Sequence, residues 1–150
     1  MNAGATEDGN SAVKAKIHHI GVVVDNLADM RTFLEAALGL RLVEERSFPD
    51  DRIETAYLSY GSGVQVELVE LGEPDARARR LGSSVPSRIE HIAIEVDDLD
   101  AVRPQLVAAG VVMQSDQPQR SGDTRALFSR PETSRGIVLQ VLDRKVGDGR

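Results

Sequence analysis

The sequence predicts an α+β protein made of two tandem β-α-β-β-β modules, whose strands form one curved mixed sheet around a groove. Three observations support this prediction. A nine-residue segment that begins at His19 is repeated from His91, an apolar pattern of helical period follows each copy, and further apolar strand-like segments complete each half. Since a module with one helix cannot cover both faces of its own sheet, we expect the two modules to pack together.

The composition is that of an ordinary soluble globular protein, with 41% hydrophobic and 28% charged residues in 150. The absence of cysteine excludes disulfides, Cys-ligated zinc, iron–sulfur clusters and thiolate nucleophiles. A net charge of −6 and few aromatic residues argue against a nucleic-acid partner. No apolar run is long enough to span a membrane and the first ten residues are too polar for a secretory signal, so we expect no membrane partner and a cytoplasmic location.

The expected organisation is a single folded domain over residues 15–144. Polar, aperiodic tails at 1–14 and 145–150 are predicted to be disordered. Module one is expected over about 16–71 and module two over about 89–143. The linker between them, 72–88, contains a stretch at 75–81 that favours a short helix.

In the first module, a strand that starts at His19 is followed by apolar residues of helical period, which end at Gly39. Three strands are then expected at 40–43, 53–60 and 64–71, and the glycine-rich turn at 61–63 favours a hairpin between the last two. The second module repeats this order. Its helical pattern runs from Leu99 and ends at Gly110, and strands are expected at 111–113, 125–129 and 137–142.

Four polar residues occupy equivalent positions in the two modules. His19 and His91 begin equivalent strands, at an offset of 72 residues, and Glu67 and Gln140 interrupt the two apolar closing strands. Two imidazoles, one carboxylate and one amide oxygen can hold one divalent metal ion, and this donor set suits Zn, Fe, Co, Ni or Mn. Positions left open on such an ion suit catalysis better than a structural role.

Each of these residues also has a simpler interpretation. A histidine in a strand is more often hydrogen-bonded than metal-bound, and it is the repeat that favours ligands at His19 and His91. Glu67 is alternatively a solvated residue on an edge strand, and Gln140 a core amide bonded to backbone. His18 should point to the opposite face from His19, so we interpret it as structural.

The chain resembles the vicinal oxygen chelate superfamily over about residues 16–143, and within it is most similar to methylmalonyl-CoA epimerases. Several motifs carry the resemblance: His19-Ile20-Gly21-Val22, the helix ending in Leu38-Gly39-Leu40, Val66-Glu67-Leu68-Val69-Glu70, His91-Ile92-Ala93 with Val96-Asp97-Asp98-Leu99, Phe128-Ser129-Arg130-Pro131, and Gly136-Ile137-Val138-Leu139-Gln140. The resemblance implies a metal, often cobalt, on His19, Glu67, His91 and Gln140. It also implies a small-molecule substrate such as an acyl-CoA, an enolate intermediate and carboxylates that move the α-proton. With the tandem-module fold we also expect a homodimer.

Two departures from the family pattern concern proton transfer. The closing-strand ligand, usually Glu, is Gln140, which can bind a metal but cannot carry a proton. Where some epimerases have a base on the third strand, this chain has Thr55, with Glu54 one residue earlier. Alternation aims Glu54 at the other face unless a bulge shifts it, so Glu54 is a candidate base only in that case, beside Glu67.

A basic stretch follows in the second module, formed by Arg120, Arg125, Arg130 and Arg135. These side chains either bind a carboxylate or phosphate of the substrate or solvate strand edges.

Four functions are compatible with these residues. The first is a metal-dependent epimerase or isomerase that moves a proton next to a carbonyl. The second is a glyoxalase I-like lyase, for which Gln140 removes the usual carboxylate. The third is a non-enzymatic binding or resistance protein of the same fold, and the retained His pair counts against it. A dioxygenase with two His and one carboxylate is the fourth and weakest.

Overall fold

One eight-stranded mixed sheet dominates the protein. The structure is a computed structural model that describes residues 14–82 and 84–144, so the predicted tails, apart from the exposed Lys14, lie outside the described residues. The sheet has the strand order β2-β3-β4-β1-β5-β8-β7-β6. Its strands are β1 (Ala15–Val24), β2 (Arg41–Phe48), β3 (Ile53–Ser59), β4 (Gln65–Leu71), β5 (Ser87–Val96), β6 (Gln119–Ser121), β7 (Thr124–Phe128) and β8 (Val138–Arg144).

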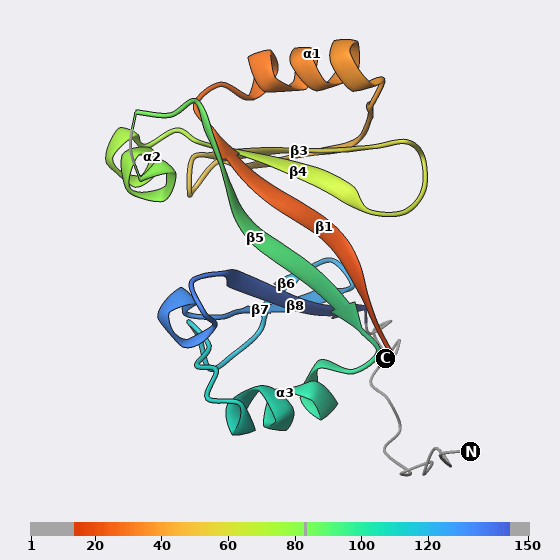
Figure 1. Cartoon of the computed structure of the whole chain (residues 1–150), viewed down its shortest axis with the longest axis vertical. Helices are drawn as coiled ribbons and strands as arrows, with labels where there is room; N and C mark the ends of the chain where they lie inside the picture. Colours follow the sequence, from red (N-terminus) through yellow and green to blue (C-terminus); the bar gives the residue numbers. More distant parts are fainter. Residues whose placement is uncertain (1–13, 83, 145–150) are drawn as a thin grey trace, which may run out of the picture.

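The two halves of the sheet repeat one topology, as the sequence predicts. Strand β1 pairs in parallel with β4 in the first half, and β5 pairs in parallel with β8 in the second. The two halves are joined by the antiparallel pair β1–β5, which crosses the middle of the molecule in Figure 1. The α+β fold with tandem β-α-β-β-β modules is therefore confirmed.

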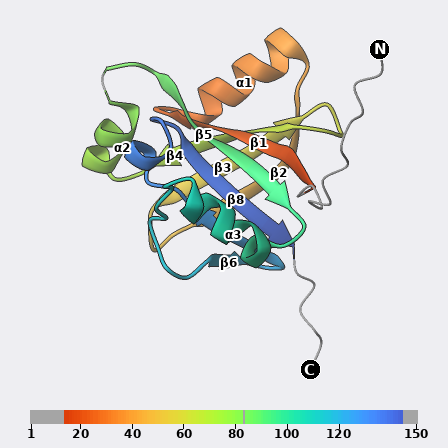
Figure 2. The same cartoon turned by 60° about the horizontal axis from the view of Figure 1, so that its bottom comes forward.

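Three α-helices accompany the sheet within residues 14–82 and 84–144: α1 (Leu27–Leu38), α2 (Pro74–Leu81) and α3 (Leu99–Ala108). A short 3₁₀ helix, η1, covers Pro131–Thr133. Helices α1 and α3 lie on opposite sides of the strands, one per module (Figures 1 and 2). The helix expected in the linker is α2, which begins one residue earlier than predicted, at Pro74. No helix in the described part of the chain is long and apolar enough to cross a membrane.

Each long helix is fixed to its closing strand in the same way. The Glu70 carboxylate, at the end of β4, accepts a hydrogen bond from the Leu27 N–H at 2.7 Å. In the second module the fully buried Asp143 carboxylate accepts the Leu99 N–H at 2.8 Å. A carboxylate at a helix N-terminus satisfies free N–H groups and complements the helix dipole. Helix α1 ends as predicted at Gly39, whose φ of 70° suits glycine.

The core lies between each helix and its half-sheet. In module one, Val24, Leu40, Leu58 and Leu68 form a buried cluster. In module two, the corresponding cluster is formed by Val96, Leu99, Val102, Leu127 and Val141. Because these side chains point toward the helices, the opposite face of the sheet is left for the groove.

The prediction of a strand at 111–113 was wrong. Only Met113 bridges Ser129 there. The outer neighbour of β7 in the sheet is β6, which the sequence did not indicate. Residues near Val112 bond instead to the η1 region: Val112 N–H donates to Thr133 Oγ1, and Val112 O accepts from Arg130 N–H. The segment therefore satisfies its backbone without a strand ladder.

Candidate metal centre

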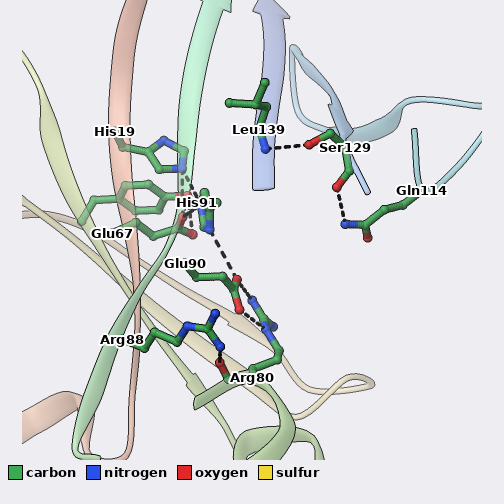
Figure 3. A network of polar contacts seen from close by, with 10 residues as sticks. His19, Glu67, Arg80, Arg88, Glu90, His91, Gln114, Ser129 and Leu139 are labelled. Atoms are coloured by element: carbon green, nitrogen blue, oxygen red, sulfur yellow. Dashed lines mark hydrogen bonds and ion pairs between the residues drawn. The ribbon is translucent and has the colours of Figure 1, made fainter. Parts of the chain in front are cut away.

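Three buried side chains converge on one point at the middle of the sheet. His19, Glu67 and His91 are 1%, 8% and 4% exposed. The Glu67 Oε2 atom lies 2.9 Å from His19 Nε2 and 3.1 Å from His91 Nε2, and the two Nε2 atoms are 3.2 Å apart (Figure 3). These are three of the four residues that the sequence assigned to the metal, and the structure brings them together.

The meeting of the three side chains follows from the strand order. Their strands, β1, β4 and β5, are neighbours at the centre of the sheet, and Gly21 of β1 is opposite both Glu67 and His91. A Cβ atom on Gly21 would lie 1.9 Å from His91 Cε1, far inside any contact distance. The missing side chain is therefore what makes room for the His91 ring.

Two bulges adjust the β1–β5 pair beside the cluster. The pairing passes from Ile17 to His19 against consecutive residues of β5, so His18 is an extra residue in β1. It later passes from His91 to Ile89 against consecutive residues of β1, so Glu90 is an extra residue in β5. A bulge bends the strand and changes the direction of its side chains.

The first bulge overturns the prediction for His18. This side chain lines the same cavity as His19, and its Nδ1 lies 2.7 Å from His19 Nδ1. Strict alternation, on which the prediction depended, does not hold across a bulge. Arg144 contacts the other ring nitrogen of His18, at 3.0 Å.

The second bulge brings Glu90 to the other side of His91. Glu90 Oε1 lies 3.5 Å from His91 Nδ1, and the Glu90 carboxylate is bound by the Arg80 guanidinium of α2 (Figure 3). The sequence analysis missed Glu90. A signal was present, because His18 and Glu90 are polar residues at the same offset of 72 as the two ligand histidines.

The charges of the cluster are strongly coupled. Burial opposes ionisation of Glu67, but hydrogen bonds from His19 and His91 outweigh it and hold the pKa of Glu67 well below its usual range. Burial would also lower the pKa of His91, yet its bonds to Glu67 and Glu90 raise that pKa to about 9. In the metal-free protein, His91 is therefore a cation between two carboxylates.

The donor set fits a divalent metal ion. One ligand atom from each of the three residues lies within 4.8 Å of the others. Ligand atoms in a tetrahedral zinc site are about 3.3 Å apart, so the separations seen here need little adjustment. Both histidines point Nε2 at the shared centre and engage Nδ1 elsewhere, as metal-bound histidines do.

The cluster lies on the wall of a cavity of about 730 Å³. Gln140 lines this cavity from β8, next to Ala93 of β5. Its role as fourth ligand stays a prediction. Tyr57 also lines it and donates from its hydroxyl to Glu67 Oε1 at 2.9 Å. Burial and the nearby Glu67 carboxylate raise the pKa of Tyr57, so its hydroxyl remains a donor.

Glu54 is not brought to this site. It is exposed, accepts a hydrogen bond from Ser47 Oγ at 2.6 Å, and does not line the cavity, whereas its neighbour Thr55 does. The register between β3 and β4 runs without a shift through Glu54, so alternation holds there and aims this carboxylate away. The structure therefore places the Glu54 carboxylate outside the cavity that holds the His–Glu–His cluster.

Most of the arginines that line the cavity are not the ones that the sequence indicated. Of the four arginines that the sequence indicated, only Arg120 lines it. Arg125 is instead ion-paired with the buried Asp143, at 2.9 and 2.5 Å. The cavity receives Arg46, Arg80 and Arg144 from distant parts of the chain. Arg46 is held by Glu44 and lies over the Tyr57 ring, 5.4 Å from its centroid.

Known proteins with similar sequences include enzymes of two kinds. A lactoylglutathione lyase of Neisseria meningitidis is 27% identical over 135 residues, which cover 89% of this chain and 94% of the relative. An ethylmalonyl-CoA/methylmalonyl-CoA epimerase of Cereibacter sphaeroides is 25% identical over 129 residues, covering 84% and 96%.

Among solved structures, methylmalonyl-CoA epimerase from Mycobacterium tuberculosis is similar, with a TM-score of 0.75 and 26% identity over 87% of this chain and 88% of that one. The sequence model of the glyoxalase/bleomycin resistance protein/dioxygenase superfamily matches residues 18–128. Since this match spans most of the chain and the fold agrees with it, the chain belongs to the glyoxalase/bleomycin resistance protein/dioxygenase superfamily.

Proposed function

We propose that this protein is a metal-dependent epimerase or isomerase that moves a proton at a carbon next to a carbonyl, with an acyl-CoA such as methylmalonyl-CoA as its substrate. The observation that carries the proposal is the buried convergence of His19, Glu67 and His91 on the wall of a large cavity. Similarity to methylmalonyl-CoA epimerases supports the substrate class.

The metal would be held by His19, Glu67 and His91, with Gln140 as the proposed fourth ligand. When bound, a divalent ion withdraws electrons from the carbonyl oxygen of a substrate and makes the adjacent C–H more acidic. The His–Glu–His cluster faces the cavity with its donor atoms already together, so little reorganisation is needed.

Proton transfer is assigned to Glu67. Thr55 and Gln140, at the positions where epimerases carry carboxylates, have no ionisable carboxyl group. The cavity has three other carboxylates: Glu44 and Glu90 are each held by an arginine, and Asp51 lies in the exposed turn between β2 and β3. Tyr57 donates to Glu67 Oε1 and so restricts the orientation of this carboxylate. The two remaining arginines of the cavity, Arg120 and Arg144, supply positive charge for an anionic substrate.

The test is deuterium exchange at the α-carbon of methylmalonyl-CoA in heavy water, with protein loaded with Co²⁺. We expect exchange by the wild type, and a loss of about 10²–10⁴-fold in Glu67→Gln at saturating metal. The matched control is Glu54→Gln, the same substitution on the same sheet but outside the cavity, which should exchange at the wild-type rate.

The alternative function is a lyase, and a second substrate tested with the same Co²⁺-loaded protein distinguishes it from an epimerase. Conversion of the hemithioacetal of methylglyoxal and glutathione, without exchange on methylmalonyl-CoA, would assign the lyase reaction instead. Wild-type protein that binds metal and performs neither reaction would contradict the proposal. The cytoplasmic location and the homodimer stay predictions.

A further inference from the structure

The residue before each ligand histidine occupies the same structural position in both modules. His18 and Glu90 are each the extra residue of a bulge in the β1–β5 pair, and both line the cavity. Bulges are enriched beside active sites, where they redirect a side chain. In each of the two strands, the bulge turns the extra residue and the ligand histidine that follows it toward the same centre.

Each bulged residue contacts the Nδ1 atom of the histidine that follows it. His18 Nδ1 lies 2.7 Å from His19 Nδ1, and Glu90 Oε1 lies 3.5 Å from His91 Nδ1. These contacts leave both Nε2 atoms turned toward Glu67. The orientation of a metal-binding imidazole is commonly fixed through its other nitrogen in this manner.

The two contacts differ in charge. Glu90 places a carboxylate, 16% exposed, beside His91 and is itself held by Arg80 from α2. His18 is a second imidazole, and Arg144 contacts its far nitrogen. A carboxylate partner raises the basicity of an imidazole ligand, whereas a second imidazole mainly orients it.

We propose that Glu90 and His18 are the positioning residues of the metal centre, with Glu90 making His91 the stronger of the two histidine ligands. This inference depends on the metal site of the proposed function and deepens it. Since the two residues follow the internal repeat, each module brings its own ligand histidine together with a residue that orients it.

The experiment measures the affinity of metal-free protein for Zn²⁺ by competition with a chromogenic chelator, and for Co²⁺ by its visible absorption. We expect Glu90→Gln to weaken binding ten- to hundredfold. We expect His18→Leu to weaken it less, and to change the Co²⁺ spectrum. Thermal unfolding of each metal-free variant checks that the fold is retained.

Arg80→Gln distinguishes positioning from a structural role. This substitution breaks the same ion pair as Glu90→Gln but leaves the carboxylate beside His91. Positioning predicts that Arg80→Gln keeps metal affinity close to that of the wild type, whereas a structural role of the ion pair predicts that both variants weaken binding alike.

Two outcomes would overturn the inference, and they are distinguishable. Tight metal binding by the wild type with unchanged affinity in Glu90→Gln and His18→Leu would refute the positioning roles and leave the proposed function intact. Wild-type protein that binds neither Co²⁺ nor Zn²⁺ would refute both.

Discussion

Substitution of Gly21 by alanine should destroy the metal centre although it replaces none of the ligand residues. The new Cβ would lie 1.9 Å from His91 Cε1, 2.2 Å from Nε2 and 2.3 Å from Nδ1. Ordinary contact begins at 3.4 Å, so the ring has to move by about 1.5 Å. Metal–ligand distances tolerate changes of only about 0.2 Å, so His91 can no longer serve as a ligand.

The expected result for Gly21→Ala is a loss of metal affinity as large as that in His91→Ala. Overpacking of this kind costs about 1–3 kcal/mol of folding free energy, which a stable domain tolerates. The assay is titration of the metal-free protein with Co²⁺, together with thermal unfolding.

The internal repeat supplies the control for this substitution. Ala93 occupies the position equivalent to Gly21 and is paired with His19. Ala93→Gly should cost about 1 kcal/mol of stability because glycine weakens a strand, yet it should keep metal binding. Wild-type affinity in Gly21→Ala would refute the steric reasoning.

Three further predictions concern charge. Asp143→Asn should cost about 3 kcal/mol in urea unfolding, because it leaves Arg125 without its buried carboxylate, and should spare metal binding. In the metal-free protein, the raised pKa of His91 stabilises the fold fully below about pH 6.5, and this stabilisation is lost as the pH rises through about 9. The lowered pKa of Glu90, about 2, stabilises the fold fully above about pH 4.5, and this stabilisation is lost as the pH falls toward 2. A thermal unfolding profile that His91→Gln leaves unchanged between pH 7 and 9.5 would contradict the first of these two assignments.

The internal repeat made most of the fold predictable from the sequence. An offset of 72 residues aligned His19 with His91, and the same period predicted both long helices and the closing strands. The segment near Val112 could not be predicted in this way, because its hydrogen bonds to the η1 region replace a strand ladder that its composition alone would favour.

The site was predictable where strand alternation holds. His19, Glu67 and His91 meet as expected, and Glu54 lies outside the cavity because the β3–β4 pairing has no register shift at this residue. Alternation failed at His18 because a bulge adds one residue to β1. Bulges depend on the pairing of two distant strands, which no local pattern encodes. Two polar residues in succession, repeated at His18–His19 and Glu90–His91, were nevertheless a signal of them.

Equilibrium titration of the metal-stripped protein with Co²⁺ tests the central claim most directly. The His–Glu–His cluster predicts one equivalent bound by the wild type, with an absorption spectrum typical of nitrogen and oxygen ligands. It predicts loss of this binding in both His19→Ala and His91→Ala, with the fold retained in circular dichroism. One equivalent bound with unchanged affinity and spectrum in either variant would contradict the assignment of the metal to these residues.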